Sequence, residues 1–215
     1  ERVEMKPQNL LIYSAAAWSG FFVMGIELLG GRLLAPYFGS SIFVWGGIIA
    51  VFMTCLSAGY LIGGHLSIHS PSMGRLGALL TAEALLALPI IVLGDQSLEY
   101  LSYLVPDPRY GSLLGSLLLF GAPTLVSGMI SPYAVRLLIA DLKQSGRSAG
   151  VLYFASTLGS AAGTIITSFY LVLLAEINSI ILGLILISCC VGITLVLVDM
   201  IRSRARQPAQ EAVCE

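Results

Sequence analysis

The amino-acid sequence predicts an all-α protein, a polytopic membrane helical bundle with six transmembrane helices. Of the 215 residues, 57% are hydrophobic and only 11% are charged, whereas soluble globular chains carry about 25% charged residues. The apolar residues gather in six segments, each close to the roughly 20 residues that cross a hydrocarbon core about 30 Å thick. The basic residues fall almost entirely on one side of these segments, as the positive-inside rule requires.

The six predicted spans follow one another with short polar connections. They are residues 10–34, 41–66, 74–93, 110–134, 150–174 and 179–201. Residues 1–9 then form an N-terminal segment, residues 10–201 the membrane domain, and residues 202–215 a polar tail that we expect to lack regular structure. Between the third and fourth spans, the sequence QSLEYLSYL predicts a short interfacial helix with Tyr100 and Tyr103 at the level of the lipid headgroups.

The distribution of basic residues predicts the orientation of the chain. Six spans place both termini on the same side of the membrane. Arg109 falls on the opposite side and Arg32 lies inside a span. The other nine basic residues fall on the side of the termini: Arg2, Lys6, Arg75, Arg136, Lys143, Arg147, Arg202, Arg204 and Arg206. This asymmetry predicts that both termini are cytoplasmic.

Among the charged residues inside the predicted spans, the candidates for a site are Glu27, Arg32 and Glu83. Each costs roughly 2.5–3.5 kcal/mol at the centre of a bilayer, so each should face protein or a water-filled cavity. Glu27 and Arg32 are about 140° apart around a helix and do not form an i,i+4 pair. Two interpretations stay open. In the first, Glu27 and Glu83 hold an amine or relay a proton. In the second, Glu83 pairs with Arg32, and the charges only hold the helices together.

Two tyrosines follow a proline near the ends of the first and fourth spans, Tyr37 and Tyr133. Both fit an interfacial aromatic belt and a cation–π contact equally well. With the three charged residues they complete the predicted substrate-binding set of Glu27, Arg32, Glu83, Tyr37 and Tyr133. The sequence has no GxSxG, HExxH or paired-cysteine metal motif. We therefore expect no catalytic residue, no metal, no cofactor and no nucleic-acid partner.

Short similarities between the two halves predict an inverted 3+3 repeat. The first span ends in GGRLLAPY and the fourth in SGMISPY, while the second contains TCLSAG and the fifth TLGSAAG. Because three spans is an odd number, the two halves would be inverted in the membrane, as in many transporters. Gly59-x-x-x-Gly63 and Gly159-x-x-x-Gly163 also predict close packing of helix backbones.

Three segments resemble the membrane domain of the spermidine-synthase-like integral membrane proteins. These are GRLLAPYFGSSIFVWGGIIAVFMTCLSAGYLIGG, GAPTLVSGMISPYAVRLL and GRSAGVLYFASTLGSAAGT, and the similarity covers about residues 15–175. The resemblance implies a bundle similar to half of a major facilitator transporter, in a bacterial cytoplasmic (inner) membrane. In that family the bundle is commonly joined to a soluble aminopropyltransferase-like domain. The present sequence has no Gly-rich nucleoside-binding loop for such a domain, so we expect no enzyme activity from it.

The sequence leaves two functions open. In the first, the chain binds or transports a small cationic, polyamine-like solute, with Glu27 and Glu83 as counter-charges. In the second, it is a non-catalytic structural or accessory subunit of a larger membrane complex, and its buried charges pair internally or across an interface. Besides the lipid bilayer, the expected partners are a second copy of the chain or other membrane subunits.

Overall fold

The computed structural model describes residues 7–68, 71–139 and 145–211, with side chains described from residue 8 to residue 203 within these ranges. All regular elements in these ranges are helices. They are α1 (Pro7–Phe38), α2 (Ile42–Leu66), α3 (Met73–Leu104), α4 (Pro108–Leu138), α5 (Ser145–Ile166), a π-helical turn η2 (Thr167–Leu171), α6 (Val172–Leu174) and α7 (Ile177–Glu211). Because α5, η2 and α6 run on as one segment, the described residues form six helices long and apolar enough to span a membrane. The predicted all-α, six-span fold is confirmed.

Local sequence explains where the helices begin and end. Gly39 has a φ of 79° in the turn between α1 and α2, a conformation that glycine adopts without a Cβ penalty. Ser72 caps α3, because its hydroxyl accepts a hydrogen bond from the Arg75 N–H at 3.2 Å. Asp107 caps α4 in the same way, and Pro108 occupies the first turn, where its missing N–H costs nothing.

Two helices extend beyond the predicted spans. α3 continues to Leu104, so the predicted separate interfacial helix is wrong: the segment is the last part of α3, held by Leu98, which is fully buried in the core. α7 continues to Glu211, so the prediction of an irregular tail is wrong for residues 202–211. Apart from Ser203 and Pro208, that stretch consists of arginine, alanine, glutamine and glutamate, which are good helix formers. Residues 212–215 lie outside the described residues.

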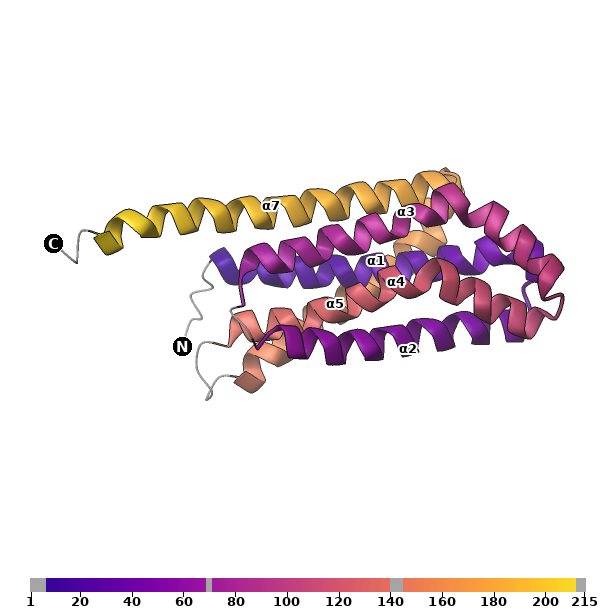
Figure 1. The fold of residues 1–215 in the computed structure, drawn as a ribbon, viewed down its shortest axis with the longest axis horizontal. Coiled ribbons are helices and arrows are strands. Elements are labelled where there is room, and N and C mark those ends of the chain that lie inside the picture. Colours follow the sequence, from indigo (N-terminus) through magenta and orange to yellow (C-terminus); the bar gives the residue numbers. More distant parts are fainter. Residues whose placement is uncertain (1–6, 69–70, 140–144, 212–215) are drawn as a thin grey trace.

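The helices lie roughly along one axis, and both described chain ends lie at the same end of the bundle (Figure 1). α2 packs mainly on α4, α5 on α1, and α3 on α7, while α1 also contacts α4, α7, α2 and α3. α1 is thus central. We call the end of the bundle near Pro7 the terminal end and the opposite end the distal end. The side chain of Arg202 on α7 donates to Gln8 Oε1 on α1 at 2.9 Å and ties these helices together at the terminal end.

Glycines set the closest helix contacts. A Cβ added to Gly59 or Gly63 would lie within 3 Å of backbone atoms of α4, and one added to Gly159 or Gly163 within 3 Å of backbone atoms of α1. The predicted backbone packing at these four glycines is confirmed. The two contacts, α2 on α4 and α5 on α1, would exchange under the 3+3 repeat, which itself stays a prediction.

Candidate functional site: a serine-lined cleft and a buried carboxyl

The carboxyl group of Glu83 lies at the meeting point of four helices. Glu83 is on α3 and its side chain is fully buried. Its Oε2 atom accepts hydrogen bonds from the hydroxyls of Ser127 on α4 at 2.6 Å and Ser19 on α1 at 3.4 Å. Its Oε1 atom accepts from the hydroxyl of Ser188 on α7 at 2.9 Å. Both carboxyl oxygens are therefore hydrogen-bonded, as a buried polar group requires.

Two of these serines have a second acceptor within reach. The Ser127 hydroxyl lies 3.0 Å from the carbonyl oxygen of Pro123, and the Ser188 hydroxyl lies 3.2 Å from the carbonyl oxygen of Leu80. A hydroxyl has one proton to donate and two lone pairs that accept. Each serine can therefore donate either to Glu83 or to a backbone carbonyl.

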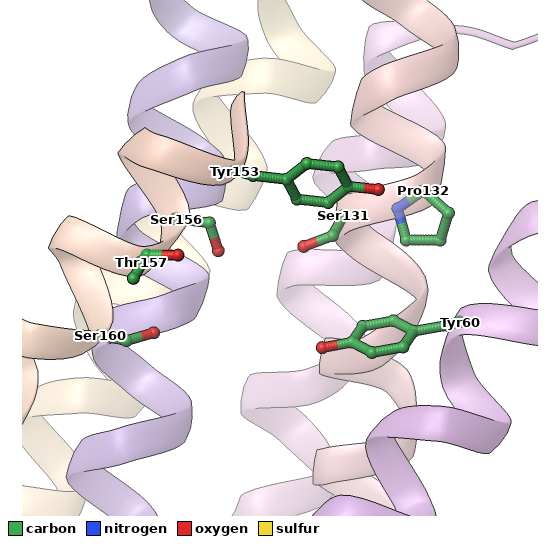
Figure 2. Close-up of a pocket in the computed structure, with 7 residues that line it drawn as sticks. All are labelled: Tyr60, Ser131, Pro132, Tyr153, Ser156, Thr157 and Ser160. Carbon is green, nitrogen blue, oxygen red and sulfur yellow. The ribbon is translucent and has the colours of Figure 1, made fainter. Parts of the chain in front are cut away.

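A cleft lined by hydroxyl groups leads toward this carboxyl. Its outer cavity, of about 380 Å³, is lined by Tyr60, Ser131, Pro132, Tyr153, Ser156, Thr157 and Ser160. Figure 2 shows the tyrosine hydroxyls of α2 and α5 directed into the space between the helices, with serines on both sides. An inner cavity of about 180 Å³ shares four of these residues and also reaches Ser19 and Ser127. The cleft thus ends at two of the three serines that bond Glu83.

The outer cavity lies nearer the terminal end of the bundle. Tyr60 stands six residues before the end of α2, and Ser131 is in the last turns of α4. Tyr153 is in the third turn of α5. No charged side chain among the described residues lines either cavity. Hydrogen bonds and aromatic faces are therefore what this cleft offers a ligand.

Glu27 does not lie in the same site as Glu83. It is half-buried on α1 and lines neither cavity of the cleft. It stands eight residues beyond Ser19, which corresponds to about 12 Å along the helix. Among the described residues it has no hydrogen-bond or ion-pair partner. The structure therefore does not place the two predicted counter-charges in one site.

Arg32 and Tyr37 lie toward the distal end, around Asp95. The side chain of Arg32 is exposed and shares a cavity of about 380 Å³ with Asp95 and Glu176. The Tyr37 hydroxyl donates to Asp95 Oδ1 at 3.3 Å. The alternative pairing of Glu83 with Arg32 is wrong, because Arg32 stands near the end of α1 with other carboxylates beside it while serines surround Glu83.

The contacts of Tyr133 indicate a role in helix packing and not in the cleft. Its side chain is fully buried, and its hydroxyl accepts a hydrogen bond from the backbone N–H of Ser72 at 3.1 Å. This bond ties α4 to the residue that caps α3. Tyr133 lines neither cavity of the cleft, and full burial does not fit the alternative of an interfacial belt.

The sequence-based candidates miss the residues that form the cleft. The carboxyl's partners Ser19, Ser127 and Ser188 were not among them, nor were the hydroxyls that line the cavities. A signal was present in the spacing, because Ser127 and Ser131 on α4 are four residues apart, as are Ser156 and Ser160 on α5. Hydroxyls at this spacing share one helix face and bond across helices in a membrane.

The fold and the site together define a polytopic helical membrane protein with a polar cleft that ends at a buried carboxyl. Comparisons of the chain with protein-family models, with curated proteins and with solved structures find no match.

Proposed function

We propose that this chain is an integral membrane protein that binds and moves a small polar solute through the hydroxyl-lined cleft. The observation that carries the proposal is the continuity of the two cavities, which share Tyr60, Ser131, Ser156 and Ser160 and reach the serines around Glu83. Polar groups inside a membrane bundle are costly and commonly mark a solute or ion pathway. A cleft of this size and lining suits a solute of a few polar groups.

A cationic, polyamine-like solute is the class that we propose. A protonated amine donates hydrogen bonds to serine oxygens and is attracted to the faces of tyrosines such as Tyr60 and Tyr153. Glu83, behind Ser19 and Ser127, supplies the carboxyl at the inner end of the cleft. The position of Glu27 outside the cleft removes it from this role. The resemblance of residues 31–64 to spermidine-synthase-like membrane proteins also favours a polyamine-like ligand.

We further propose that the protein lies in a bacterial inner membrane with both termini in the cytoplasm. Arg75, Arg136, Arg147 and Arg202 lie near the terminal end of the bundle, and Arg109 lies at the distal end. This separation supports the orientation that the positive-inside rule predicts. The cleft then opens toward the cytoplasmic half of the membrane.

Binding and uptake of radiolabelled spermidine by proteoliposomes test the proposed function. Ser131→Leu should abolish binding because the added side chain fills the part common to both cavities. Tyr60→Phe removes one hydroxyl and should weaken binding severalfold. Tyr100→Phe is the matched control, because Tyr100 is exposed near the distal end of α3. If the wild type neither binds nor moves spermidine, the cationic class is wrong. Equal binding by the wild type and Ser131→Leu would refute the cleft as the site.

A second function, that of an accessory subunit, is favoured by the exposure of α5. Within α5 only Leu152 and Gly163 are buried, and hydroxyl-bearing Thr157 is exposed on it. A second copy of the chain or another membrane subunit would cover this helix and close the open side of the cleft. Mass spectrometry of the complex, extracted gently from its native membrane, distinguishes the cases. Other subunits in fixed ratio would favour the accessory role, whereas a monomer or homodimer would favour the solute-binding role.

A further inference from the structure

We propose that Glu83 is a reversible proton-binding site, loaded from the cleft through Ser127. The inference concerns the proton alone and does not depend on which solute the cleft takes. It stands on the arrangement of one carboxyl and three hydroxyls contributed by four different helices.

The serines can hydrogen-bond the carboxyl group of Glu83 in both of its protonation states. When Glu83 is a carboxylate, Ser127 and Ser188 donate to it at 2.6 and 2.9 Å. When Glu83 is protonated on Oε2, it donates to the Ser127 oxygen, and the Ser127 proton turns to the carbonyl oxygen of Pro123, 3.0 Å away. No buried donor or acceptor loses its partner in either state. A proton can therefore be gained or lost without the cost of an unsatisfied polar group.

The proton reaches Glu83 from one side. The inner cavity is lined by Ser127 and Ser19 and joins the outer cavity. Ser188, on the opposite side of the carboxyl, is fully buried and lines neither cavity. In the transfer, a hydronium ion in the cleft gives a proton to the Ser127 oxygen, which passes its own proton to Oε2. Hydronium becomes water, the carboxylate becomes a carboxylic acid, and Ser127 stays a neutral hydroxyl.

The close contacts favour a proton over a metal cation. The hydroxyls of Ser127 and Ser188 lie directly on the two carboxyl oxygens. A coordinated metal ion would have to stand between these oxygens and push them apart. A proton occupies no such space, because it lies within the hydrogen bond that is already formed.

No charged side chain among the described residues is bonded to Glu83. On the three helices that contact it, the described charged groups stand at least eight residues along the helix from the contacting serine, or about 12 Å. These groups are Glu27 and Arg32 on α1, Arg109 and Arg136 on α4, and Asp199 and Arg202 on α7. Further titratable side chains in this part of the described chain are Cys189, which follows Ser188 on α7, and Tyr60 and Tyr153 on the cleft wall. The proton on Glu83 is therefore exchanged with the cleft and not with a charged neighbour.

Infrared difference spectroscopy of the protein in lipid nanodiscs tests the proposal. Moving the sample from alkaline to acidic buffer should produce the carbonyl stretch of a buried carboxylic acid, with loss of the corresponding carboxylate bands. The change should reverse on return to alkaline buffer. Glu83→Gln should remove this band entirely. Glu27→Gln is the matched control, since Glu27 is half-buried outside the cleft, and it should retain the band.

A second variant keeps the test valid if Glu83→Gln does not fold. Ser127→Ala preserves the carboxyl but removes its closest hydroxyl, so the band should remain with a shifted frequency and appear more slowly. A band that survives Glu83→Gln in the folded protein would overturn the proposal. A band that disappears when sodium replaces choline at constant pH would overturn the preference for a proton over a metal cation, because sodium would then displace the proton from Glu83.

Discussion

The hydroxyl of Ser127 on α4 lies 2.6 Å from the Oε2 atom of Glu83 on α3, within the buried interior of the bundle. The two residues are 44 positions apart in the sequence. Their contact joins helices across the bundle, and Ser127 at the same time lines the inner cavity. One hydrogen bond therefore connects the packing of α3 and α4 with the polar cleft.

Ser127→Ala should destabilise the folded bundle modestly. The change removes a donor to a buried carboxyl, and interhelical side-chain hydrogen bonds in membranes are worth about 0.6 kcal/mol on average and up to about 1.7 kcal/mol. We expect a loss of about 1 kcal/mol in the free energy of unfolding, measured by denaturant titration in mixed micelles. Ser57→Ala is the control, because the Ser57 hydroxyl bonds only the carbonyl of Met53 in its own helix and is exposed. Equal effects of the two changes would contradict a structural role for the Ser127 contact.

Two adjacent glycines on α2 should respond oppositely to alanine. A Cβ on Gly63 would meet the backbone of Met129 on α4, whereas a Cβ on Gly64 would meet nothing within 4 Å. Overpacking at a closed contact costs about 1–3 kcal/mol. Alanine in place of glycine in an open helical position gains up to about 1 kcal/mol. Gly63→Ala should thus lower, and Gly64→Ala preserve or raise, the unfolding temperature in detergent. Similar losses from both would show that the α2–α4 contact is looser than described.

The sequence was sufficient to predict the fold, because a membrane-spanning helix needs a certain length and an apolar composition, and both can be recognised directly in the sequence. The prediction failed where helices continue beyond the apolar segment, as α3 does to Leu104 and α7 to Glu211. Hydropathy identifies apolar segments only, so it does not detect a helix that continues through polar residues. The site was harder to predict. Glu83 stood out as a charge in a span, but its partners come from three other helices. Their identity depends on which faces meet, and neither composition nor local spacing fixes that.

Tyr133→Phe should reveal how far one hydroxyl stabilises the loop before α3. The Tyr133 hydroxyl accepts from the Ser72 N–H at 3.1 Å, and Tyr133 is fully buried. Removing the oxygen leaves the N–H without this acceptor, which costs about 1 kcal/mol or more. We expect a lower unfolding temperature and faster hydrogen exchange at the Ser72 amide. Tyr103→Phe, at an exposed position of α3, should change neither quantity. Unchanged exchange at Ser72 in Tyr133→Phe would contradict the bond.

The orientation can be tested with single cysteines at the two ends of the bundle. In a variant lacking the native cysteines, Tyr103→Cys places a thiol at the distal end and Ile68→Cys places one in the turn at the terminal end, both at exposed positions. A membrane-impermeant maleimide added to intact cells should label position 103 and not position 68, because the basic residues of the terminal end favour the cytoplasm. Inverted membrane vesicles should give the reverse pattern. Labelling of position 68 in intact cells would place the termini outside, and the cleft would then open away from the cytoplasm.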